Sequence, residues 1–471
     1  MVFFDPLRLD FPASKLYFCP NNNPKGNIMK KLTILLLLLC ATLSVGAQAV
    51  FEPVELTIDS PSGLYSAGEQ VTVYGQLREE CTTPLDLSVM VNGTTIATQQ
   101  NIALTTEART PIWTGSFDEA SSVILSVGPQ GDHKNLTTIG FVVAAEQFTP
   151  SFNKPRDLEK FWRKQIRRMR RSSTEITLVS VDVPQKWADK YVCYDLEISM
   201  PEGAPVRGYI AYPREAADRS LPITIFAHAA GVRKAHCQST PERALQWASR
   251  GSGAIALDIN AHGYLNGQPQ SYYDGLEEGA LKDYSKWPLT DHQSFYFRTM
   301  FLRLVRALDY ATRSSMWDGE RVLIYGESQG GAQAAALAGI DKRVTMAVLN
   351  VPAMTDLGCV VAGHSAGWPR TYSQGAATEP TAALYQKLLP YYDAAQLLGL
   401  TKAKLVVEVG LIDRTCPPEG VCATFNNSPS TDKTLLSFPY RPHTSVNARY
   451  RKEWRERVED VRNSIIDAYL Q

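Results

Sequence analysis

The sequence predicts an α/β fold, a mostly parallel sheet with helices on both faces, preceded by a small all-β sandwich domain. Two observations favour this prediction. From about residue 174 to the C-terminus, short apolar runs alternate with amphipathic segments, as in buried parallel strands joined by helices. From about residue 50 to 147, short alternating runs are separated by turn sequences such as Asn92-Gly93, with no helical period.

The front domain, residues 50–147, is expected to form strands within VTVYGQL (71–77), LDLSVMV (85–91) and SVILSVG (122–128). A spacer without a ligand is the simpler interpretation of this domain, because its sequence shows no marked cluster of exposed aromatic residues. Binding of a polysaccharide or contact with a partner is the alternative.

The main domain, residues 148–471, begins with a linker that contains two prolines, and a helix is expected after it. Four apolar residues share one face of that helix: Leu158, Trp162, Ile166 and Met169. The basic run on its other face, residues 167–171, is interpreted as solvated. Further strands are expected within residues 221–228, 253–260, 322–325, 347–352 and 404–410, and helices within 243–249, 295–313 and 450–469.

The composition excludes several classes of function. The chain has 471 residues, enough for two or three domains, and 48 basic residues balance 48 acidic ones. Zero net charge does not indicate a polyanion, so no nucleic-acid partner is expected. The cysteines after residue 49 are sparse and lack CxxC spacing, which argues against a disulfide scaffold or a zinc site. Cys416 and Cys422 either pair in an oxidising compartment or remain buried thiols.

Residues 1–49 are interpreted as a signal peptide region whose real start is Met29. Lys30 and Lys31 follow this methionine, residues 32–43 are an apolar run of suitable length, and small residues for cleavage come next. The run is too short to be taken as a membrane span, so no integral span is expected after cleavage. We expect export to a bacterial periplasm or beyond the cell.

One stretch carries the most specific chemical signal. The apolar run 322–325 is followed by Gly-Glu-Ser-Gln-Gly (326–330) and an Ala-rich helical segment. Strand, GxSxG and helix are the context of a nucleophile elbow, typical of the α/β-hydrolase fold, and place the Ser328 hydroxyl at an exposed turn. A second GxSxG at residues 363–367 has no clear helix after it. We interpret it as a loop, so Ser328 rather than Ser365 is the expected nucleophile.

A serine hydrolase also needs a base and an acid that orients the base. In the α/β-hydrolase order both follow the serine. Only two histidines follow Ser328: His364 belongs to the second GxSxG, whereas His443 lies between the last expected strand and the terminal helix. His443 is therefore the expected base. Asp413, just past the end of a strand, is the expected acid.

The oxyanion hole is expected to combine the backbone amide of Gln329 with an amide of the loop FAHAAG, residues 226–231. The amide of Ala230 is the first choice and that of Ala229 the alternative. His228 of the same loop is interpreted as a packed residue that holds the shape of the loop.

From about Phe148 to the C-terminus the chain resembles the acetyl xylan esterase / cephalosporin C deacetylase family of carbohydrate esterases. The resemblance rests on FNKPRDLEKFW, FRTMFLRLVRALDYA, GESQGG, NVPAMTD and GLIDRTCPP, in this order. It implies a triad of Ser328, Asp413 and His443, oxyanion donors at Ala230 and Gln329, and removal of acetyl groups from sugar hydroxyls. Residues 260–262 read Asn-Ala-His where the family usually has Arg-Gly-Gln. Relatives form oligomeric rings. The additional front domain could alter this assembly, so a homo-oligomer is one alternative for the oligomeric state.

The expected function is therefore that of an exported serine esterase that deacetylates xylan fragments, related oligosaccharides or small acetyl esters. Such chemistry requires no metal and no cofactor. Four aromatic residues are candidates for stacking on sugar, with packing of long loops as the alternative: Tyr264, Tyr272, Tyr273 and Trp368. Two other functions stay open, a secreted peptidase of the prolyl-oligopeptidase type and an inactive hydrolase fold that binds glycans.

Overall fold

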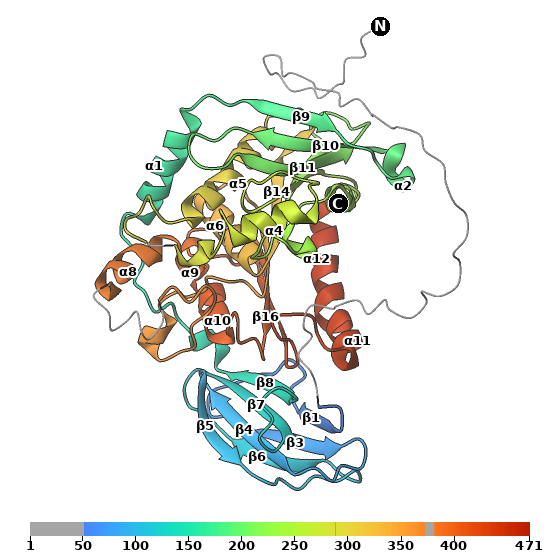
Figure 1. Cartoon of the computed structure of the whole chain (residues 1–471), viewed down its shortest axis with the longest axis vertical. Helices are drawn as coiled ribbons and strands as arrows, with labels where there is room; N and C mark the ends of the chain where they lie inside the picture. Colours follow the sequence, from blue (N-terminus) through green and yellow to red (C-terminus); the bar gives the residue numbers. More distant parts are fainter. Residues whose placement is uncertain (1–50, 288, 373–380) are drawn as a thin grey trace.

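The computed structural model describes residues 51–287, 289–372 and 381–471, and the predicted signal region lies outside them (Figure 1). The predicted fold class is confirmed. An α/β-hydrolase domain with one large sheet follows an N-terminal domain made only of strands.

The N-terminal domain is a sandwich of two sheets. Within the described residues, one sheet has the order β1-β3-β6 and the other the order β2-β8-β7-β4-β5. The strands are β1 (Val54–Ile58), β2 (Leu64–Tyr65), β3 (Val71–Leu77), β4 (Leu85–Val91), β5 (Thr94–Gln99), β6 (Thr110–Gly115), β7 (Ser121–Pro129) and β8 (Thr137–Val143). Alternate residues of β3 and β4 point inward, and Val73, Leu87 and Phe141 share one core.

The main sheet has nine strands in the described part of the chain, in the order β17-β16-β15-β14-β12-β13-β11-β10-β9. These are β9 (Ile176–Ser180), β10 (Tyr191–Ile198), β11 (Val206–Pro213), β12 (Leu221–Ala227), β13 (Ile255–Ile259), β14 (Trp317–Glu327), β15 (Met346–Asn350), β16 (Lys404–Gly410) and β17 (Lys433–Phe438). All pairings from β13 to β17 are parallel, and β9, β10 and β11 pair antiparallel at one end. The carboxyl ends of the parallel strands therefore gather at one edge, where reactive loops lie in open α/β sheets.

Helices cover both faces of this sheet. The principal ones are α1 (Leu158–Arg170), α3 (Pro241–Ala248), α4 (Gln270–Glu278), α5 (Phe297–Ala311), α6 (Gln329–Ile340), α8 (Ala382–Leu388), α9 (Ala394–Leu398), α10 (Pro418–Asn427), α11 (Arg451–Trp454) and α12 (Asp460–Leu470). Ile324 of β14 packs in the core under α1, α5 and α6, whereas its neighbour Leu323 packs in the core under α3 and α12. Successive side chains of one strand thus pack against the helices on opposite faces of the sheet. The helix expected over 450–469 is interrupted by a π-helical turn at Arg455–Glu459.

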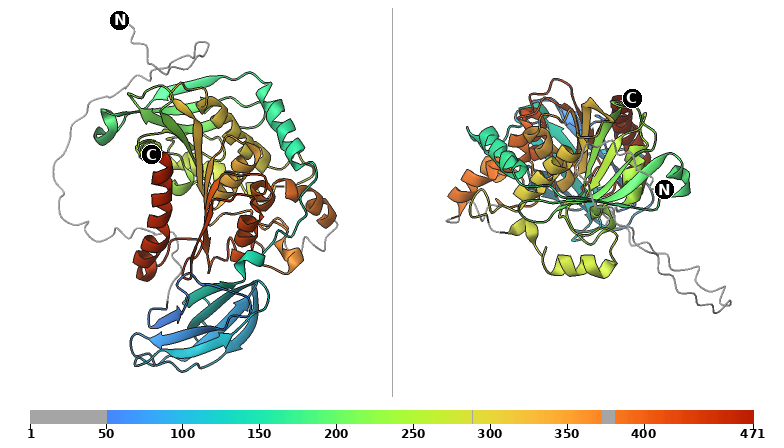
Figure 2. Two further views of the ribbon diagram at one scale, coloured as in Figure 1. Left: turned by 180° about the vertical axis from the view of Figure 1, so that it is seen from behind. Right: turned by 90° about the horizontal axis from the view of Figure 1, so that it is seen from above.

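The sandwich is docked on the ends of β16 and β17 (Figures 1 and 2). The Gly140 amide donates to the Pro439 carbonyl at 3.0 Å, and the Tyr440 hydroxyl donates to the Leu56 carbonyl at 2.8 Å. A Cβ on Gly140 would lie 2.0 Å from the carbonyl oxygen of Leu411, so the two backbones meet where only glycine fits. The sandwich therefore lies beside the strand ends that carry the reactive loops.

No helix within the described ranges is long and apolar enough to cross a membrane. All six cysteines of these ranges are free thiols, including Cys416 and Cys422, which are both buried. Of the two alternatives for this pair, the structure therefore contains the buried thiols.

Candidate active site

Ser328 lies at the turn between β14 and α6. Its backbone adopts φ 56° and ψ −120°, a conformation that costs about 1–3 kcal/mol and persists only where its surroundings enforce it. Both glycines of the motif are required by close contacts. A Cβ on Gly326 would lie 2.0 Å from the Gly330 carbonyl oxygen, and one on Gly330 would lie 2.2 Å from the Ala227 carbonyl oxygen. The sequence thus forms a tight elbow whose serine is only 7% exposed.

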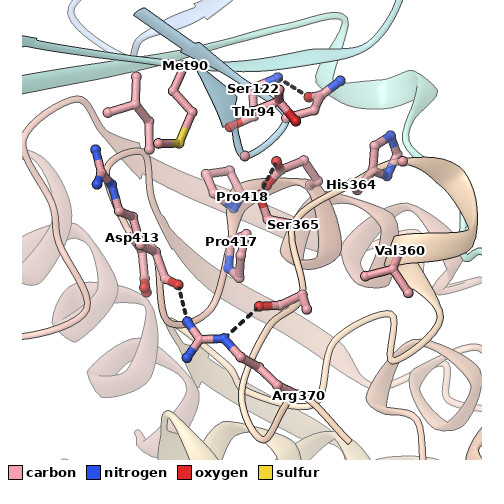
Figure 3. Close-up of a pocket in the computed structure, with 17 residues that line it drawn as sticks. Met90, Thr94, Ser122, Val360, His364, Ser365, Arg370, Asp413, Pro417 and Pro418 are labelled. Atoms are coloured by element: carbon pink, nitrogen blue, oxygen red, sulfur yellow. Dashed lines mark hydrogen bonds between the residues drawn. The ribbon is translucent and has the colours of Figure 1, made fainter. Parts of the chain in front are cut away.

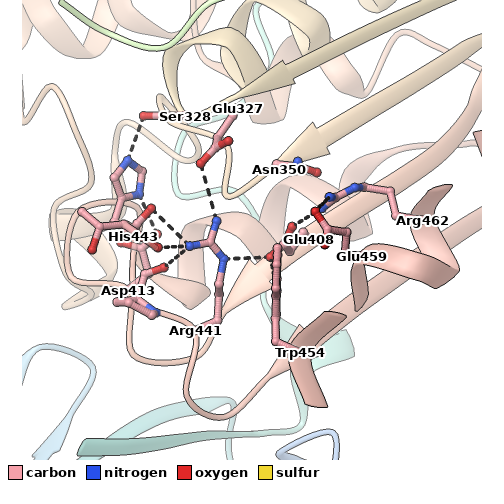
Figure 4. Close-up of polar contacts among 12 residues, drawn as sticks. Glu327, Ser328, Asn350, Glu408, Asp413, Arg441, His443, Trp454, Glu459 and Arg462 are labelled. Atoms are coloured by element: carbon pink, nitrogen blue, oxygen red, sulfur yellow. Dashed lines mark hydrogen bonds and ion pairs between the residues drawn. The ribbon is translucent and has the colours of Figure 1, made fainter. Parts of the chain in front are cut away.

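Hydrogen bonds join Ser328, His443 and Asp413 in one line (Figure 4). His443 Nε2 lies 2.9 Å from Ser328 Oγ, and His443 Nδ1 lies 2.8 Å from Asp413 Oδ2. Asp413 is fixed by its other oxygen, which accepts from the amides of Thr415 and Cys416 at 2.7 and 2.8 Å. A carboxylate only accepts, so Nδ1 carries the ring hydrogen of a neutral His443 and Nε2 is free to accept from the serine.

The Cys416 thiol is also close to these groups. The potential ligand atoms of Asp413, Cys416 and His443 all lie within 4.8 Å of one another, a spacing that could hold a metal ion. Burial, reinforced by the charge of Asp413, raises the pKa of this thiol well above its ordinary value. The thiol therefore stays protonated, and a cation would have to displace both this proton and the hydrogen between His443 and Asp413. The arrangement fits acid–base chemistry better than metal binding.

The two amides expected to form the oxyanion hole belong to the loop after β12 and to the first turn of α6. Gln329 is the first residue of α6, so its amide is one of those that a helix leaves unsatisfied. Neither this amide nor that of Ala230 donates a hydrogen bond to another described residue. The Ala230 carbonyl is held by the Cys237 thiol at 3.0 Å. Both amides are therefore available to a developing negative charge.

A chain of hydrogen bonds connects the loops that carry these two amides. His262 Nε2 lies 3.2 Å from the Gly231 carbonyl and Nδ1 lies 2.7 Å from the Tyr296 hydroxyl. The Tyr284 hydroxyl accepts from the Gly231 amide at 3.4 Å and donates to the Gln329 side-chain oxygen at 2.6 Å. Burial lowers the pKa of His262 to about 3, so the ring is neutral, with its hydrogen on Nε2. This network was not expected from the sequence, although His262 stands at a position where the chain departs from the family pattern.

His228 has the packed role that the sequence predicted. It is completely buried and makes a short hydrogen bond with Asp258 at the end of β13. Its Nδ1 lies 3.1 Å from the His236 carbonyl, and Gln333 of α6 donates to the His228 carbonyl at 3.0 Å. These contacts fix the loop from which Ala230 projects.

Arg441 holds the loop of His443. Its Nε donates to Glu408 of β16 at 2.8 Å, and its Nη2 lies 3.5 Å from Glu327 beside the nucleophile (Figure 4). The same guanidinium donates to the carbonyls of Pro442, His443 and Thr444. Neither Arg441 nor Glu408 was expected at the site from the sequence. A buried charge in the apolar run KLVVEVG was the signal that could have revealed them.

The four aromatic candidates have different surroundings. Tyr264 and Tyr273 are buried, pack on each other, and donate their hydroxyls to the carbonyls of Cys237 and Leu265. Tyr272 packs against Tyr273 and its hydroxyl accepts from the Leu265 amide. These contacts fit the loop-packing alternative. Trp368 lies nearer the triad, because its amide donates to the Thr415 carbonyl at 2.7 Å.

Ser365 makes no hydrogen bond to Asp413 or His443 in the described part of the chain. Its hydroxyl donates to Glu419 Oε1 at 3.3 Å, and the residues after it form a loop. His364 packs edge-on against Phe148.

The acetyl xylan esterase (AXE1) family matches residues 144–457, which is more than half of the chain. The chain belongs to the acetyl xylan esterase family. It is therefore a carboxylic ester hydrolase, and the matched residues include the elbow, Asp413 and His443.

Members of this family with known sequences and structures are similar over most of the chain. Acetyl esterase Axe7A of Xylanibacter ruminicola is 25% identical over 338 residues, which cover 71% of this chain and 73% of that protein. The solved acetyl xylan esterase of Paenibacillus sp. R4 is 23% identical, with a TM-score of 0.53 over 67% of this chain and 98% of its own. Acetyl xylan esterase 1 of Thermoanaerobacterium sp. JW/SL YS485 is 20% identical, with a TM-score of 0.54 over 69% and 98%. The two structures share the fold of the main domain.

Proposed function

We propose that this protein is an exported serine esterase that removes O-acetyl groups from acetylated xylan fragments or related oligosaccharides. One observation carries the proposal: Ser328 Oγ lies 2.9 Å from His443 Nε2 in a strained elbow at the N-terminus of α6. The nucleophile, its base and the amide that would receive the oxyanion thus come from one turn and one loop. Family membership supports the acetyl group as the acyl part of the substrate.

The first half of the reaction forms an acetyl-enzyme. Ser328 Oγ attacks the acetyl carbonyl while His443 Nε2 takes the serine proton. Asp413 stabilises the imidazolium that forms and, through its hydrogen bond with Nδ1, orients the His443 ring. The amides of Gln329 and Ala230 receive the negative charge of the carbonyl oxygen. The intermediate collapses when His443 protonates the departing sugar oxygen.

The second half repeats these roles with water as the nucleophile. His443 takes a proton from water, which attacks the acetyl-enzyme, and then returns the proton to Ser328 Oγ as acetate leaves. Both halves of the reaction begin with His443 carrying its ring hydrogen on Nδ1, toward Asp413, so that Nε2 can accept the proton of the nucleophile.

No observation favours the two other functions. The peptidase would need a pair of carboxylates placed to hold a substrate amino group, and the buried carboxylate of Glu408 is already engaged by Arg441 and Arg462. An inactive glycan-binding protein has no need of an intact hydrogen-bonded triad or of a strained elbow.

Hydrolysis of acetylated xylo-oligosaccharides, 4-nitrophenyl acetate and a peptide amide tests the proposal. The two esters are expected to be cleaved and the amide is not. Ser328→Ala is expected to remove the activity, and Ser365→Ala, the same change in the second GxSxG, is expected to keep it. Labelling with an organophosphate followed by peptide mapping should mark Ser328. Labelling of Ser365, or activity in Ser328→Ala, would contradict the assignment.

Export is proposed from the sequence alone, from Met29-Lys30-Lys31 and the apolar run that follows. Expression in a bacterial host, cell fractionation and N-terminal sequencing test it. The mature protein is expected outside the cytoplasm with an N-terminus near residue 49, and an intact N-terminus in the cytoplasm would contradict the proposal.

A further inference from the structure

A cleft of about 460 Å³ separates the sandwich from the esterase domain. Figure 3 shows Met90, Thr94 and Ser122 of the sandwich on one side, and Ser365, Pro417 and Pro418 of the esterase domain facing them. Clefts between domains are common places for ligands. The cleft also reaches Asp413, so it lies directly beside the proposed triad.

Two arginines line the cleft without an acidic partner. Arg370 donates only to backbone carbonyls, from Nε to Ala366 at 3.2 Å and from Nη2 to Arg414 at 3.0 Å. Neither Arg370 nor Arg414 forms an ion pair with another described residue. Both arginines are exposed, so their guanidinium groups are accessible to an anion from solvent, and partial burial lowers the pKa of Arg414. Such a guanidinium is a good receptor for a carboxylate, which it can bind through two parallel hydrogen bonds.

A third polar group of the cleft is also incompletely satisfied. Glu419 is 2% exposed, its Oε1 accepts from Ser365, and its Oε2 has no partner within the described residues. Burial raises the pKa of Glu419 to about 7, so near neutral pH a large fraction is protonated and able to donate a hydrogen bond. A protonated Glu419 adds no repulsion to an anion held by the arginines.

The lining favours an anionic sugar over a neutral one. No Phe, Tyr or Trp is among the described residues that line the cleft, so it offers no broad apolar ring for a neutral sugar to stack on. Its polar groups are hydroxyls, an amide, an imidazole, the two guanidinium groups and the carboxyl groups of Asp413 and Glu419. The Arg370 end lies close to the reaction centre, because Arg370 Nη2 donates to the carbonyl of Arg414, the residue that follows Asp413.

We propose that this cleft binds the carboxylate of a uronic acid unit that belongs to the same oligosaccharide as the acetyl group attacked by Ser328. The inference rests on the proposed function and adds a role for the sandwich, which forms one wall of the site. Arg414 and Arg370 receive the carboxylate, while Thr94 borders it from the sandwich.

The test compares two substrates that differ only at this group. One is an acetylated xylo-oligosaccharide that carries a uronic acid, and the other is the same compound with its carboxyl reduced to an alcohol. The measured quantity is the ratio of their kcat/KM values at low salt. We expect a ratio of about ten or more for the wild type, since hydrogen bonds to a charged group contribute at least this factor. Added salt is expected to lower it.

The same ratio of kcat/KM values is measured for variants on both walls of the cleft. Arg414→Gln is expected to lower it about tenfold, and Arg414→Lys to retain part of it. Thr94→Asp places a negative charge at the sandwich wall and is expected to lower the ratio similarly. Thr98→Asp is the matched control, because Thr98 lies on the same exposed strand but does not line the cleft. A wild-type ratio of one, or an unchanged ratio in both Arg414→Gln and Thr94→Asp, would overturn the proposal.

Failure of this inference is distinguishable from failure of the proposed function. Hydrolysis of 4-nitrophenyl acetate reports on the triad without using the cleft. If no ester is cleaved, calorimetric titration of the full chain with the deacetylated uronate oligosaccharide still tests the cleft. Binding that is lost on carboxyl reduction supports the inference, and equal binding of the two compounds refutes it.

Discussion

Arg441 and Glu408 form a buried ion pair with 2.8 Å between Nε and Oε1. Burial alone would raise the pKa of Glu408, but the charges of Arg441 and Arg462 outweigh it and hold the pKa below its ordinary value. Glu408 also accepts from Trp454 at 2.9 Å. The pair ties the end of β16 to the loop that carries His443, so a structural charge network determines where the proposed base lies.

Replacing Arg441 with Lys should therefore affect catalysis more than binding. Lysine keeps the charge but cannot hold Glu408 and the loop carbonyls together with a planar fork. We expect kcat for 4-nitrophenyl acetate to fall about a hundredfold with little change in KM, as expected for a misplaced base. We also expect a loss of about 2 kcal/mol in the free energy of unfolding. Arg457→Lys, at a surface pair with Glu453, is the control and should behave as the wild type. Equal effects of the two changes would contradict the role of Arg441.

Tyr284→Phe tests the hydrogen bonds between the two oxyanion loops. The change removes the hydroxyl that joins Gly231 to Gln329 but keeps the ring. We expect kcat to fall about tenfold on every ester, because one neutral hydrogen bond that positions the amides is lost. Tyr65→Phe removes a buried phenol contact in the sandwich and is the control. A fall in stability with unchanged kcat would show that the network is only structural.

Glu419 should make stability depend on pH. Burial, assisted by the charges of Asp356 and Asp413, raises its pKa from 4.5 to about 7. The unfolded state releases this proton at lower pH than the folded state, so stability is lost as pH rises from about 4.5 to about 7. The glutamine of Glu419→Gln does not titrate. The free energy of unfolding of this variant, relative to that of the wild type, should therefore rise between pH 5 and pH 8, by about 3 kcal/mol at most. Thermal unfolding at both pH values measures this difference, and a difference that does not change with pH would contradict the prediction.

The sequence was sufficient for the fold class and for finding the three residues that the structure joins by hydrogen bonds. The apolar run 322–325 and the glycines of the elbow left few alternatives, because strand burial and tight turns restrict residue types. Chain order then separated His443 from His364. These signals are local or depend on order, so they can be read without coordinates.

Long-range contacts could not be predicted in the same way. Arg441 reaches Glu408 of β16 from the loop after β17, and Tyr284 reaches Gln329 from a distant loop. The spacing of these residues in the sequence does not indicate that the members of each pair are in contact. Three tyrosines near the expected substrate mouth are packed on one another, because an aromatic residue in a long loop has the same sequence signature whether it faces a ligand or a neighbour. The cleft between the domains depends on how the sandwich docks, which the sequence of either domain does not reveal.

Gly93 is where this docking can be tested most directly. It has φ +82°, and a Cβ on it would lie 2.2 Å from Ser365 Oγ across the cleft. Gly93→Ala should therefore combine backbone strain with a clash between the domains, at a cost of about 2–3 kcal/mol. Gly131→Ala is a matched control, because Gly131 has φ +75° and nothing within 4 Å of its added Cβ. It should show the strain alone, about 1 kcal/mol.

The contact itself is isolated by adding Ser365→Gly to both alanine variants and measuring the free energy of unfolding by urea denaturation. Removal of the Ser365 hydroxymethyl group should recover stability in Gly93→Ala and none in Gly131→Ala, since only the first pair is in contact. Gly93→Ala should also lower kcat/KM for acetylated oligosaccharides more than for 4-nitrophenyl acetate, because the small ester does not need the sandwich wall. If Gly93→Ala and Gly131→Ala cost the same and Ser365→Gly rescues neither, the sandwich does not rest on the loop of residues 363–367 as the structure shows.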